Sequence, residues 1–350
     1  MPLVEFTSKG LYCRAGDFYI DPWRPVERAV ITHAHSDHAR AGSNAYLCHH
    51  FTKPLLQLRL GEHAFQSVEW NEAVFMNGVK VSLHPAGHVI GSSQVRIEHD
   101  HEVWVVSGDY KVEDDGISGK FEPVPCDVFV TESTFGLPIY NWKTQQEIYK
   151  NIQDWVIDKV EQGIVPVLIG YSIGKAQRLL HCVAETGLPV YLHGAVYNVH
   201  TALVNAGIHM PEAKRVDPSL PNKTYRGGIV IAPGSAESSS WIKRFSPYAV
   251  GLCSGWMQVR GNSRRSNADA AFALSDHADW KGLLQTIKAT GAGRVFVTHG
   301  FQAAFSRYLN EQGIPAAEVK TEYGNDEETA LTAETNLNTT DQTEIIPAKD

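Results

Sequence analysis

The sequence lacks the long hydrophobic runs and paired cysteines that mark membrane and secreted proteins. Its 350 residues contain no run of about 18 apolar residues, so no membrane span is expected. The N-terminus, Met1–Phe6, has neither the basic nor the apolar region of a signal peptide. The five cysteines are scattered and form no CxxC pair, which indicates free thiols in a reducing compartment. These absences predict a cytoplasmic protein without membrane association.

The chain also lacks an excess of positive charge. The net charge is −8, but residues 321–350 hold eight acids and one base, which leaves −1 on residues 1–320. A broad basic surface for binding duplex nucleic acid is therefore not expected. Bound divalent cations would add positive charge locally, so a phosphodiester substrate is not excluded. Residues 323–350 are acidic and nearly free of large apolar groups, which predicts a disordered tail.

Short strand-like segments separated by turns fill the first third of the chain. Examples are Phe18–Ile20, Ala29–Thr32 and Glu102–Ser107, and Asn77-Gly78 predicts the turn of a hairpin. Strand-like segments resume after residue 272, and one of them is expected over Val295–Gly300. These two parts of the chain are therefore expected to share one β-rich core.

Between these parts, strands alternate with helices. Thr144–Gln162 has apolar residues at helical spacing, Ile164–Ile169 is an apolar strand, and Lys175–Ala184 is a second helix. Such alternation predicts a parallel sheet covered on both faces. The expected fold class is therefore α/β, with one domain inserted into another. The predicted parts are a core segment over residues 1–140, an inserted domain over 141–271, a second core segment over 272–322 and the tail over 323–350.

Four side chains that can bind metal lie within six consecutive positions directly after an apolar strand. They are His33, His35, Asp37 and His38. A loop that leaves a strand can direct all four to one region, whereas a six-residue helix cannot. The geometry suits two neighbouring ions, and imidazole with carboxylate suits zinc, then manganese or iron. The alternative interpretation is a histidine-rich surface turn.

Three further residues of the same chemical type lie at predicted strand ends. His88 follows a glycine turn, Asp109 follows the strand Val103–Val106, and His299 ends the strand Arg294–Thr298. Alone, each is more readily interpreted as a core or turn residue. Together with the histidine loop they predict a dinuclear metal site, because side chains from several strand ends can converge on one edge of a sheet.

These motifs resemble those of the metallo-β-lactamase fold, and in particular its nucleic-acid-processing branch called β-CASP. The similarity covers about residues 15–305. The short length and the start Phe18–Trp23 are similar to bacterial ligase-associated DNA exonucleases. The matching segments are Thr32–His38, Gly87-His88, Ser107–Asp109, Thr131–Gly136, Ser275–Asp279 and Thr298–Gly300.

The resemblance implies an αββα sandwich with an inserted β-CASP domain and two divalent ions, zinc first and manganese or iron as alternatives. It implies that His33, His35 and His88 hold the first ion. It implies that Asp37, His38 and His299 hold the second. Asp109 then bridges the two ions, and Asp21 supports the histidine loop from behind. A turn carboxylate before Pro22 is the other interpretation of Asp21.

Phosphodiester hydrolysis requires an activated water and a proton for the leaving O3′ atom. Two metal ions supply the first, which gives Asp37 and Asp109 a catalytic part as ligands. We expect His277 to supply the proton, with Glu132 bonded to it to set its tautomer and raise its pKa. The alternative is that His277 is a third metal ligand or the first residue of a helix.

Two strand–helix loops in the predicted insertion are candidates for a phosphate pocket. Ser172, Gly174 and Lys175 lie at a helix start, where backbone N–H groups can face an anion. Ser235 and Ser238 lie in a second loop rich in small donors. Such loops could hold a terminal 5′ phosphate. The alternative is two ordinary connecting loops.

The sequence as a whole predicts a two-metal nuclease that degrades single-stranded DNA from a 5′ end in DNA repair. Its expected partners are the nucleic acid and a repair ligase or helicase. DNA-acting members of the family often have Val at the last motif, whereas this chain has His299. An RNA exonuclease or endonuclease of the RNase J type is therefore the alternative. A hydrolase of small thioesters or lactams, or a non-catalytic scaffold, are further alternatives.

Overall fold

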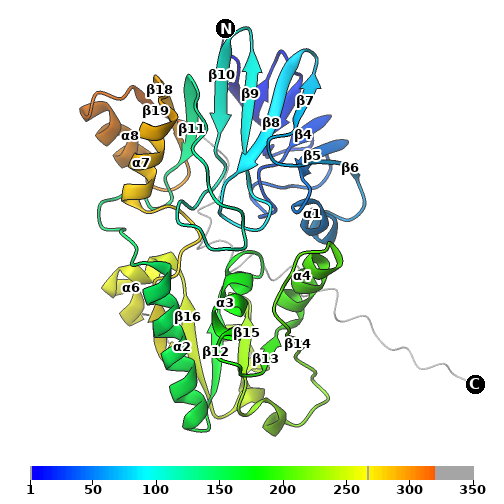
Figure 1. Cartoon of the computed structure of the whole chain (residues 1–350), viewed down its shortest axis with the longest axis vertical. Coiled ribbons are helices and arrows are strands. Elements are labelled where there is room, and N and C mark those ends of the chain that lie inside the picture. The colour runs from blue at the N-terminus through cyan, green and yellow to red at the C-terminus, as the bar shows by residue number, and fades with distance from the viewer. Residues whose placement is uncertain (1, 266–267, 320–350) are drawn as a thin grey trace, which may run out of the picture.

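The computed structural model describes residues 2–265 and 268–319, so the predicted tail over 323–350 lies outside the described residues. The described residues form three sheets. The upper half of Figure 1 holds two of them, and the lower half holds the third. The α/β class predicted from the sequence is confirmed.

The first sheet has the strand order β1-β2-β3-β4-β5-β6. Its first three strands are antiparallel and the later pairs are parallel. The helix α1 (Lys53–Leu60) joins β5 to β6 and begins at a proline-containing turn, a helix that the strand-rich interpretation of this region missed. The strands are β1 (Glu5–Thr7), β2 (Gly10–Cys13), β3 (Phe18–Ile20), β4 (Arg28–Val30), β5 (Ala45–His49) and β6 (Ala64–Val68).

The second sheet is mixed and has the order β19-β18-β11-β10-β9-β8-β7. The predicted hairpin between β7 and β8 is confirmed, because Asn77 and Gly78 both adopt positive φ, at 48° and 84°. The strands are β7 (Ala73–Met76), β8 (Val79–Pro85), β9 (Ser93–His99), β10 (Glu102–Val106), β11 (Val128–Glu132), β18 (Arg294–Thr298) and β19 (Ala316–Glu318).

These two sheets pack against each other through one hydrophobic core. Val128 and Val130 of β11 face this core, which they share with Ile20 and Leu47 of the first sheet. Phe129, between them, faces the opposite way and packs with α7 (Trp280–Thr290) and α8 (Gln302–Glu311). Successive strand residues point to opposite faces, so a strand with consecutive apolar residues, such as Val128–Val130 of β11, must be covered on both sides.

The third sheet is entirely parallel, as predicted, with the order β14-β13-β15-β12-β16-β17. Its buried residues fall into two cores, one for each face. One face packs against α2 (Gln145–Glu161), α3 (Lys175–Ala184) and α4 (Gly194–Asn205). The strands are β12 (Val165–Ile169), β13 (Val190–Leu192), β14 (Lys214–Arg215), β15 (Ile229–Ala232), β16 (Tyr248–Cys253) and β17 (Ala270–Phe272).

Short helical segments cover the other face of the third sheet. Tyr225, Ala236 and Phe245 are buried there against β12 and β15. These segments are η1 (Asn222–Tyr225), α5 (Gly234–Glu237) and η2 (Ser240–Phe245), and two further short helices, η3 (Gly255–Gln258) and α6 (Arg260–Arg265), follow β16. The helices predicted over Thr144–Gln162 and Lys175–Ala184 are confirmed as α2 and α3.

The expectation of β-rich structure after residue 272 is only partly correct. The strand β18 is present, but the helices α7 and α8 hold more residues of the segment than its strands do. Asp279 caps α7 by accepting a hydrogen bond from the Gly282 backbone N–H at 2.7 Å, and Gly291 ends it at φ 67°. Both are readable helix boundaries that the β interpretation overlooked.

Candidate metal centre

The predicted ligand residues come from loops at one edge of the two packed sheets. His33 to His38 follow β4, His88 lies between β8 and β9, Asp109 follows β10, and His299 follows β18. The loop before His88 turns tightly at Gly87, where φ is 73° and an added Cβ would lie 2.5 Å from the Lys111 carbonyl oxygen. Glycine is therefore required for this turn.

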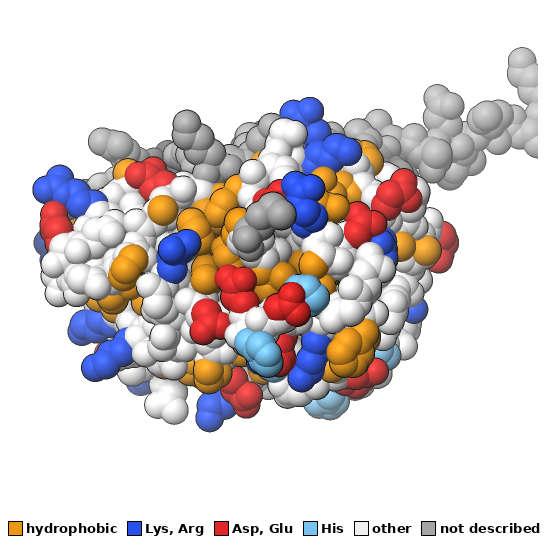
Figure 2. Space-filling view, turned by 90° about the horizontal axis from the view of Figure 1, so that it is seen from above, with side chains coloured by type: hydrophobic (Ala, Val, Ile, Leu, Met, Phe, Trp, Pro, Cys, Tyr) orange, Lys and Arg blue, Asp and Glu red, His pale blue; other side chains and the backbone are white. Residues whose placement is uncertain are grey.

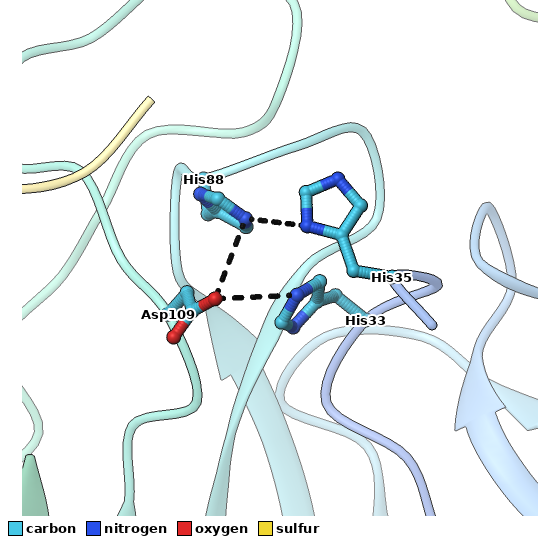
Figure 3. Close-up of side chains that lie close together, drawn as sticks. All are labelled: His33, His35, His88 and Asp109. Atoms are coloured by element: carbon cyan, nitrogen blue, oxygen red, sulfur yellow. Dashed lines mark hydrogen bonds and ion pairs between the residues drawn. The ribbon is translucent and has the colours of Figure 1, made fainter. Parts of the chain in front are cut away.

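The first candidate group consists of His33, His35, His88 and Asp109, whose potential ligand atoms lie within 4.8 Å of one another. Figure 3 shows these side chains pointing toward a common centre. The Asp109 Oδ2 atom lies 3.5 Å from His33 Nε2 and 3.7 Å from His88 Nε2. The structure thus brings together the residues predicted for the first ion.

The second candidate group consists of Asp37, His38 and His299. The His38 Nε2 atom lies 3.4 Å from Asp37 Oδ2 and also 3.4 Å from Asp109 Oδ2. The rings of His38 and His299 stack with centroids 4.9 Å apart. Because the same Asp109 oxygen is near histidines of both groups, Asp109 lies where the predicted bridging carboxylate belongs.

Hydrogen bonds to backbone carbonyls set the tautomers of His35 and His88. His35 Nε2 donates to the Ile173 carbonyl at 3.1 Å, and His88 Nδ1 donates to the Asp276 carbonyl at 2.9 Å. A carbonyl oxygen can only accept, so the other nitrogen of each neutral ring carries a lone pair. These two nitrogens, His35 Nδ1 and His88 Nε2, lie 3.1 Å apart. Lone pairs that face each other repel, and a cation bound between these two nitrogens would remove the repulsion.

Asp21 and Thr32 orient the other two histidines. Thr32 Oγ1 donates to Asp21 Oδ2 at 2.6 Å and therefore accepts from His33 Nδ1 at 3.0 Å. His38 Nδ1 donates to the same Asp21 oxygen at 2.7 Å. Both histidines consequently turn Nε2 toward Asp109. The position of Asp21 matches its predicted supporting part. The part of Thr32 was not identified from the sequence, because its contact with Asp21 joins residues 11 positions apart.

The donor set fits divalent cations in charge as well as geometry. Burial holds the pKa of His33 and of His88 well below the ordinary value and that of His299 at about 4, so these rings are neutral. Burial opposes ionisation of Asp109, but the neighbouring histidines, His38 first and then His277 and His299, together outweigh it and keep the pKa of the carboxyl well below its usual range. Within the described residues, the buried atoms His33 Nε2 and Asp109 Oδ1 have no hydrogen-bond partner. Nitrogen and oxygen donors of this kind suit zinc, manganese or iron.

His277 and Glu132 form a buried pair beside the first group. His277 Nδ1 lies 2.9 Å from Glu132 Oε2, and the Tyr110 backbone N–H donates to Glu132 Oε1 at 2.7 Å. With Nδ1 donating to Glu132, the ring can exchange a proton through Nε2. Asp109, Glu132 and His277 also form a third group within 4.8 Å, so the alternative of His277 as a ligand stays open.

The predicted phosphate loops follow neighbouring parallel strands, β12 and β15. Two of their groups already have partners within the protein. The Gly174 backbone N–H donates to Gln177 Oε1 at 2.7 Å, and Lys175 Nζ is buried 3.6 Å from Asp276 Oδ2. Ser172 lies in the loop after β12, Ser235 lies in α5 after β15, and Ser238 is the residue that ends α5. The sequence made Lys175 a candidate for binding phosphate and did not indicate that its side chain is buried.

Comparison with known proteins gives relatives of several kinds. The chain is 33% identical over 321 residues to a "Probable DNA ligase" of Opitutus terrae, covering 90% of this chain and 31% of that protein. It is 22% identical over 235 residues to an "RNase J-like protein" of Methanocaldococcus jannaschii, covering 56% and 55%. It is 28% identical over 135 residues to an "RNase aCSPSF2" of Saccharolobus solfataricus, covering 37% and 27%. The chain thus spans about a third to a half of the length of the first two relatives. No protein-family model matches it.

A solved structure supports the arrangement of the fold. A protein of unknown function from Enterococcus faecalis V583 superposes with a TM-score of 0.60 at 12% identity, covering 85% of this chain and 80% of that one. These relatives bear out the resemblance carried by the motifs, which is to the β-CASP branch of the metallo-β-lactamase fold.

Proposed function

We propose that the protein is a two-metal nuclease that removes nucleotides from a 5′ end of single-stranded DNA in the cytoplasm. One observation carries the proposal: two groups of mostly buried ligands, drawn from four loops, share the single carboxylate Asp109. We assign the two packed sheets to a metallo-β-lactamase αββα core over residues 1–140 and 272–322. Residues 141–271, with the third sheet, are then the inserted β-CASP domain.

The chain's own residues divide the chemistry between them. When bound, divalent cations at the two groups supply Lewis acidity and make water nucleophilic at neutral pH. His33, His35 and His88 would hold one ion, and Asp37, His38 and His299 the other, with Asp109 between them. His277 then donates a proton to the leaving O3′ atom through Nε2, while Glu132 holds its Nδ1–H.

Preference for a 5′ terminus is proposed to come from the third sheet. Carboxyl ends of parallel strands are a common place for ligands, and the loops after β12 and β15 lie there together. Ser172 and Ser235 are the residues of this edge that we assign to a terminal phosphate. An Ser172→Ala variant should therefore lose discrimination between 5′-phosphorylated and 5′-hydroxyl strands while still cleaving both.

The choice of DNA rests on the relative named as a probable DNA ligase, which matches 90% of the chain. A ligase that carries such a segment would bring end trimming and joining together, which also makes a repair ligase or helicase the proposed partner. RNA is the second candidate, because relatives named as RNases match part of the chain and because His299 is present. The net charge of residues 1–320 is close to zero, which favours neither DNA nor RNA. Figure 2 shows acidic and basic side chains interspersed on the end of the molecule that it views.

One assay tests the proposal. Purified protein is incubated with Mn²⁺, Zn²⁺ or a chelator and with end-labelled DNA and RNA strands that carry a 5′ phosphate or a 5′ hydroxyl. Mononucleotides from 5′-phosphorylated DNA are the expected product, and cleavage should require metal and be lost in Asp109→Asn. The exposed histidine variant His101→Ala is the matched control. Preferential RNA cleavage would select the second candidate, and turnover only of small lactams or thioesters would overturn both.

A further inference from the structure

A buried network joins helix α3 of the third sheet to the loop that carries His277. Arg178, which is 1% exposed, donates from Nη1 to the Ser275 carbonyl at 2.6 Å and also to the Asp276 carboxylate. Its Nη2 donates to Gln145 Oε1 at 2.9 Å. The guanidinium thus binds both the backbone of Ser275 and the side chain of Asp276, which are consecutive residues of the loop.

The second oxygen of Asp276 is held from the same helix. Lys175 Nζ lies 3.6 Å from Asp276 Oδ2, and Asp115 lies 3.7 Å from Arg178 Nε. Asp276 is only 2% exposed, so both its oxygens face cations in a region without solvent. Two buried positive charges are therefore balanced by two negative ones, and the direction of the Asp276 carboxylate is determined by α3.

Asp276 also touches the candidate metal centre through its backbone. Its carbonyl accepts the Nδ1–H of His88, which leaves His88 Nε2 facing Asp109. The next residue, His277, is bonded to Glu132. One short loop thus fixes the tautomer of a proposed ligand and the position of the proposed acid, and the only cationic side chains holding its carboxylate among the described residues come from α3.

Stability alone does not account for this network. Removing two charges from water is costly, and well-packed apolar residues of similar volume usually stabilise a protein as well as a buried ion pair does. Apolar side chains cannot, however, hold a carbonyl and a carboxylate in given directions. The network therefore supplies orientation, which the loop needs because the hydrogen bonds of His88 and His277 both depend on it.

We propose that Arg178 is a positioning residue for the reaction, acting through Ser275 and Asp276 to align His88 and His277. The proposal rests on the proposed nuclease function. Partners that orient the groups around a metal centre typically contribute roughly 10–100-fold in activity. Arg178→Ala should therefore lower kcat on single-stranded DNA by roughly 10–100-fold with KM little changed.

Chemical rescue separates orientation from general damage. The Arg178→Ala variant leaves a space of guanidinium size, so added guanidinium at non-denaturing concentration should restore part of kcat, whereas sodium chloride of equal ionic strength should not. Arg178→Lys keeps the charge but lacks the planar fork, so it should also be slow. Arg307→Ala, which removes an 81% exposed arginine paired with Glu311, is the matched control and should retain wild-type rates.

A spectroscopic readout does not depend on turnover. In the metal-free protein, the side-chain ¹⁵N resonances of His88 and His277 should shift in both Arg178 variants, while those of the exposed His50 and His101 stay in place. Unchanged kcat in both variants, or lost kcat with unshifted histidine resonances and no rescue, would overturn the proposal. If Arg178→Ala does not fold, Arg178→Lys decides. A wild-type protein inactive on every strand would refute the nuclease function, while the resonances would still test the positioning.

Discussion

At the residue scale, the position of single protons prepares the site. The carbonyls of Ile173 and Asp276 and the Thr32 hydroxyl each accept a histidine N–H, so the lone-pair nitrogens face inward. A metal ion binds the unprotonated nitrogen, and a partner on the far nitrogen fixes which one that is. The centre therefore depends on residues that never touch an ion.

The part of Thr32 is testable by removing only its hydroxyl. Thr32→Val keeps the volume but deletes the oxygen that accepts from His33 Nδ1 and donates to Asp21. We expect metal affinity to fall roughly 10–100-fold with the fold retained. Competition with a chromophoric chelator measures the affinity, and circular dichroism checks the fold. Wild-type affinity would show that the hydroxyl is dispensable.

His277 is expected to act on protons rather than on metal. Replacing it by Ala removes a general acid, whose contribution is typically about 10²–10⁴-fold in rate, and should leave metal content near normal. Elemental analysis and single-turnover kinetics of the same sample measure the two effects. Loss of an ion instead would assign His277 to the third ligand group with Asp109 and Glu132.

At the element scale, strand ends and the turns after them place the ligands. The loop after β18 turns at His299 and Gly300, whose φ values are 54° and 62°. An added Cβ at Gly300 would lie 2.4 Å from the Ser133 carbonyl oxygen and 2.4 Å from the Thr134 Cα atom. This turn is therefore closely packed against the segment that follows β11, and it places His299.

Gly300→Ala tests that packing. The left-handed backbone costs an alanine about 1 kcal/mol, and displacement of the Ser133 backbone adds to this, so we expect a larger loss of stability with weaker binding at the second group. The matched control is Gly313→Ala, because Gly313 also has positive φ, 78°, but an added Cβ there meets nothing within 4 Å. Denaturant unfolding gives the difference. Equal losses in both variants would show that the contact with Ser133 relaxes freely.

At the scale of the whole molecule, the centre ties together distant parts of the chain. Its ligands run from His33 to His299 and come from both packed sheets, while the loop between β12 and α3 contacts His35 through the Ile173 carbonyl. Ions that bind only the folded state stabilise it by mass action. None of the described helices has the length and apolar character to cross a bilayer.

Metal removal should therefore lower the stability of the entire fold. Ions present at a hundredfold excess over Kd contribute about 2.7 kcal/mol for each site, so chelation should lower Tm by several degrees and zinc or manganese should restore it. Calorimetry of the apo and reloaded protein measures this shift. The Asp109→Asn variant should show a much smaller difference, and an unchanged Tm on chelation would contradict folded-state binding.

Sequence reasoning reached the residues whose signal is local. His33 to His38 stand in one loop, and α2 and α3 are marked by helical spacing and by the capping residue Thr144. Sequence reasoning missed the helices α7 and α8, because it took the whole segment after residue 272 to be rich in strands on the evidence of its apolar residues. Periodicity and caps act over one or two turns, so they are legible without a partner.

The sequence by itself determined which side chains can bind metal and the alternation of strands and helices that makes a parallel sheet. It also determined the resemblance to the β-CASP branch, which relates the two. Tertiary structure alone decided that Thr32 relays between Asp21 and two histidines, that Lys175 is buried, and that Arg178 grips the loop before His277. The contacts of Thr32 with Asp21 and of Arg178 with Asp276 link residues 11 and 98 positions apart. A hydrogen bond exists only when both partners are brought within reach, and packing of whole sheets, not local propensity, brings them there.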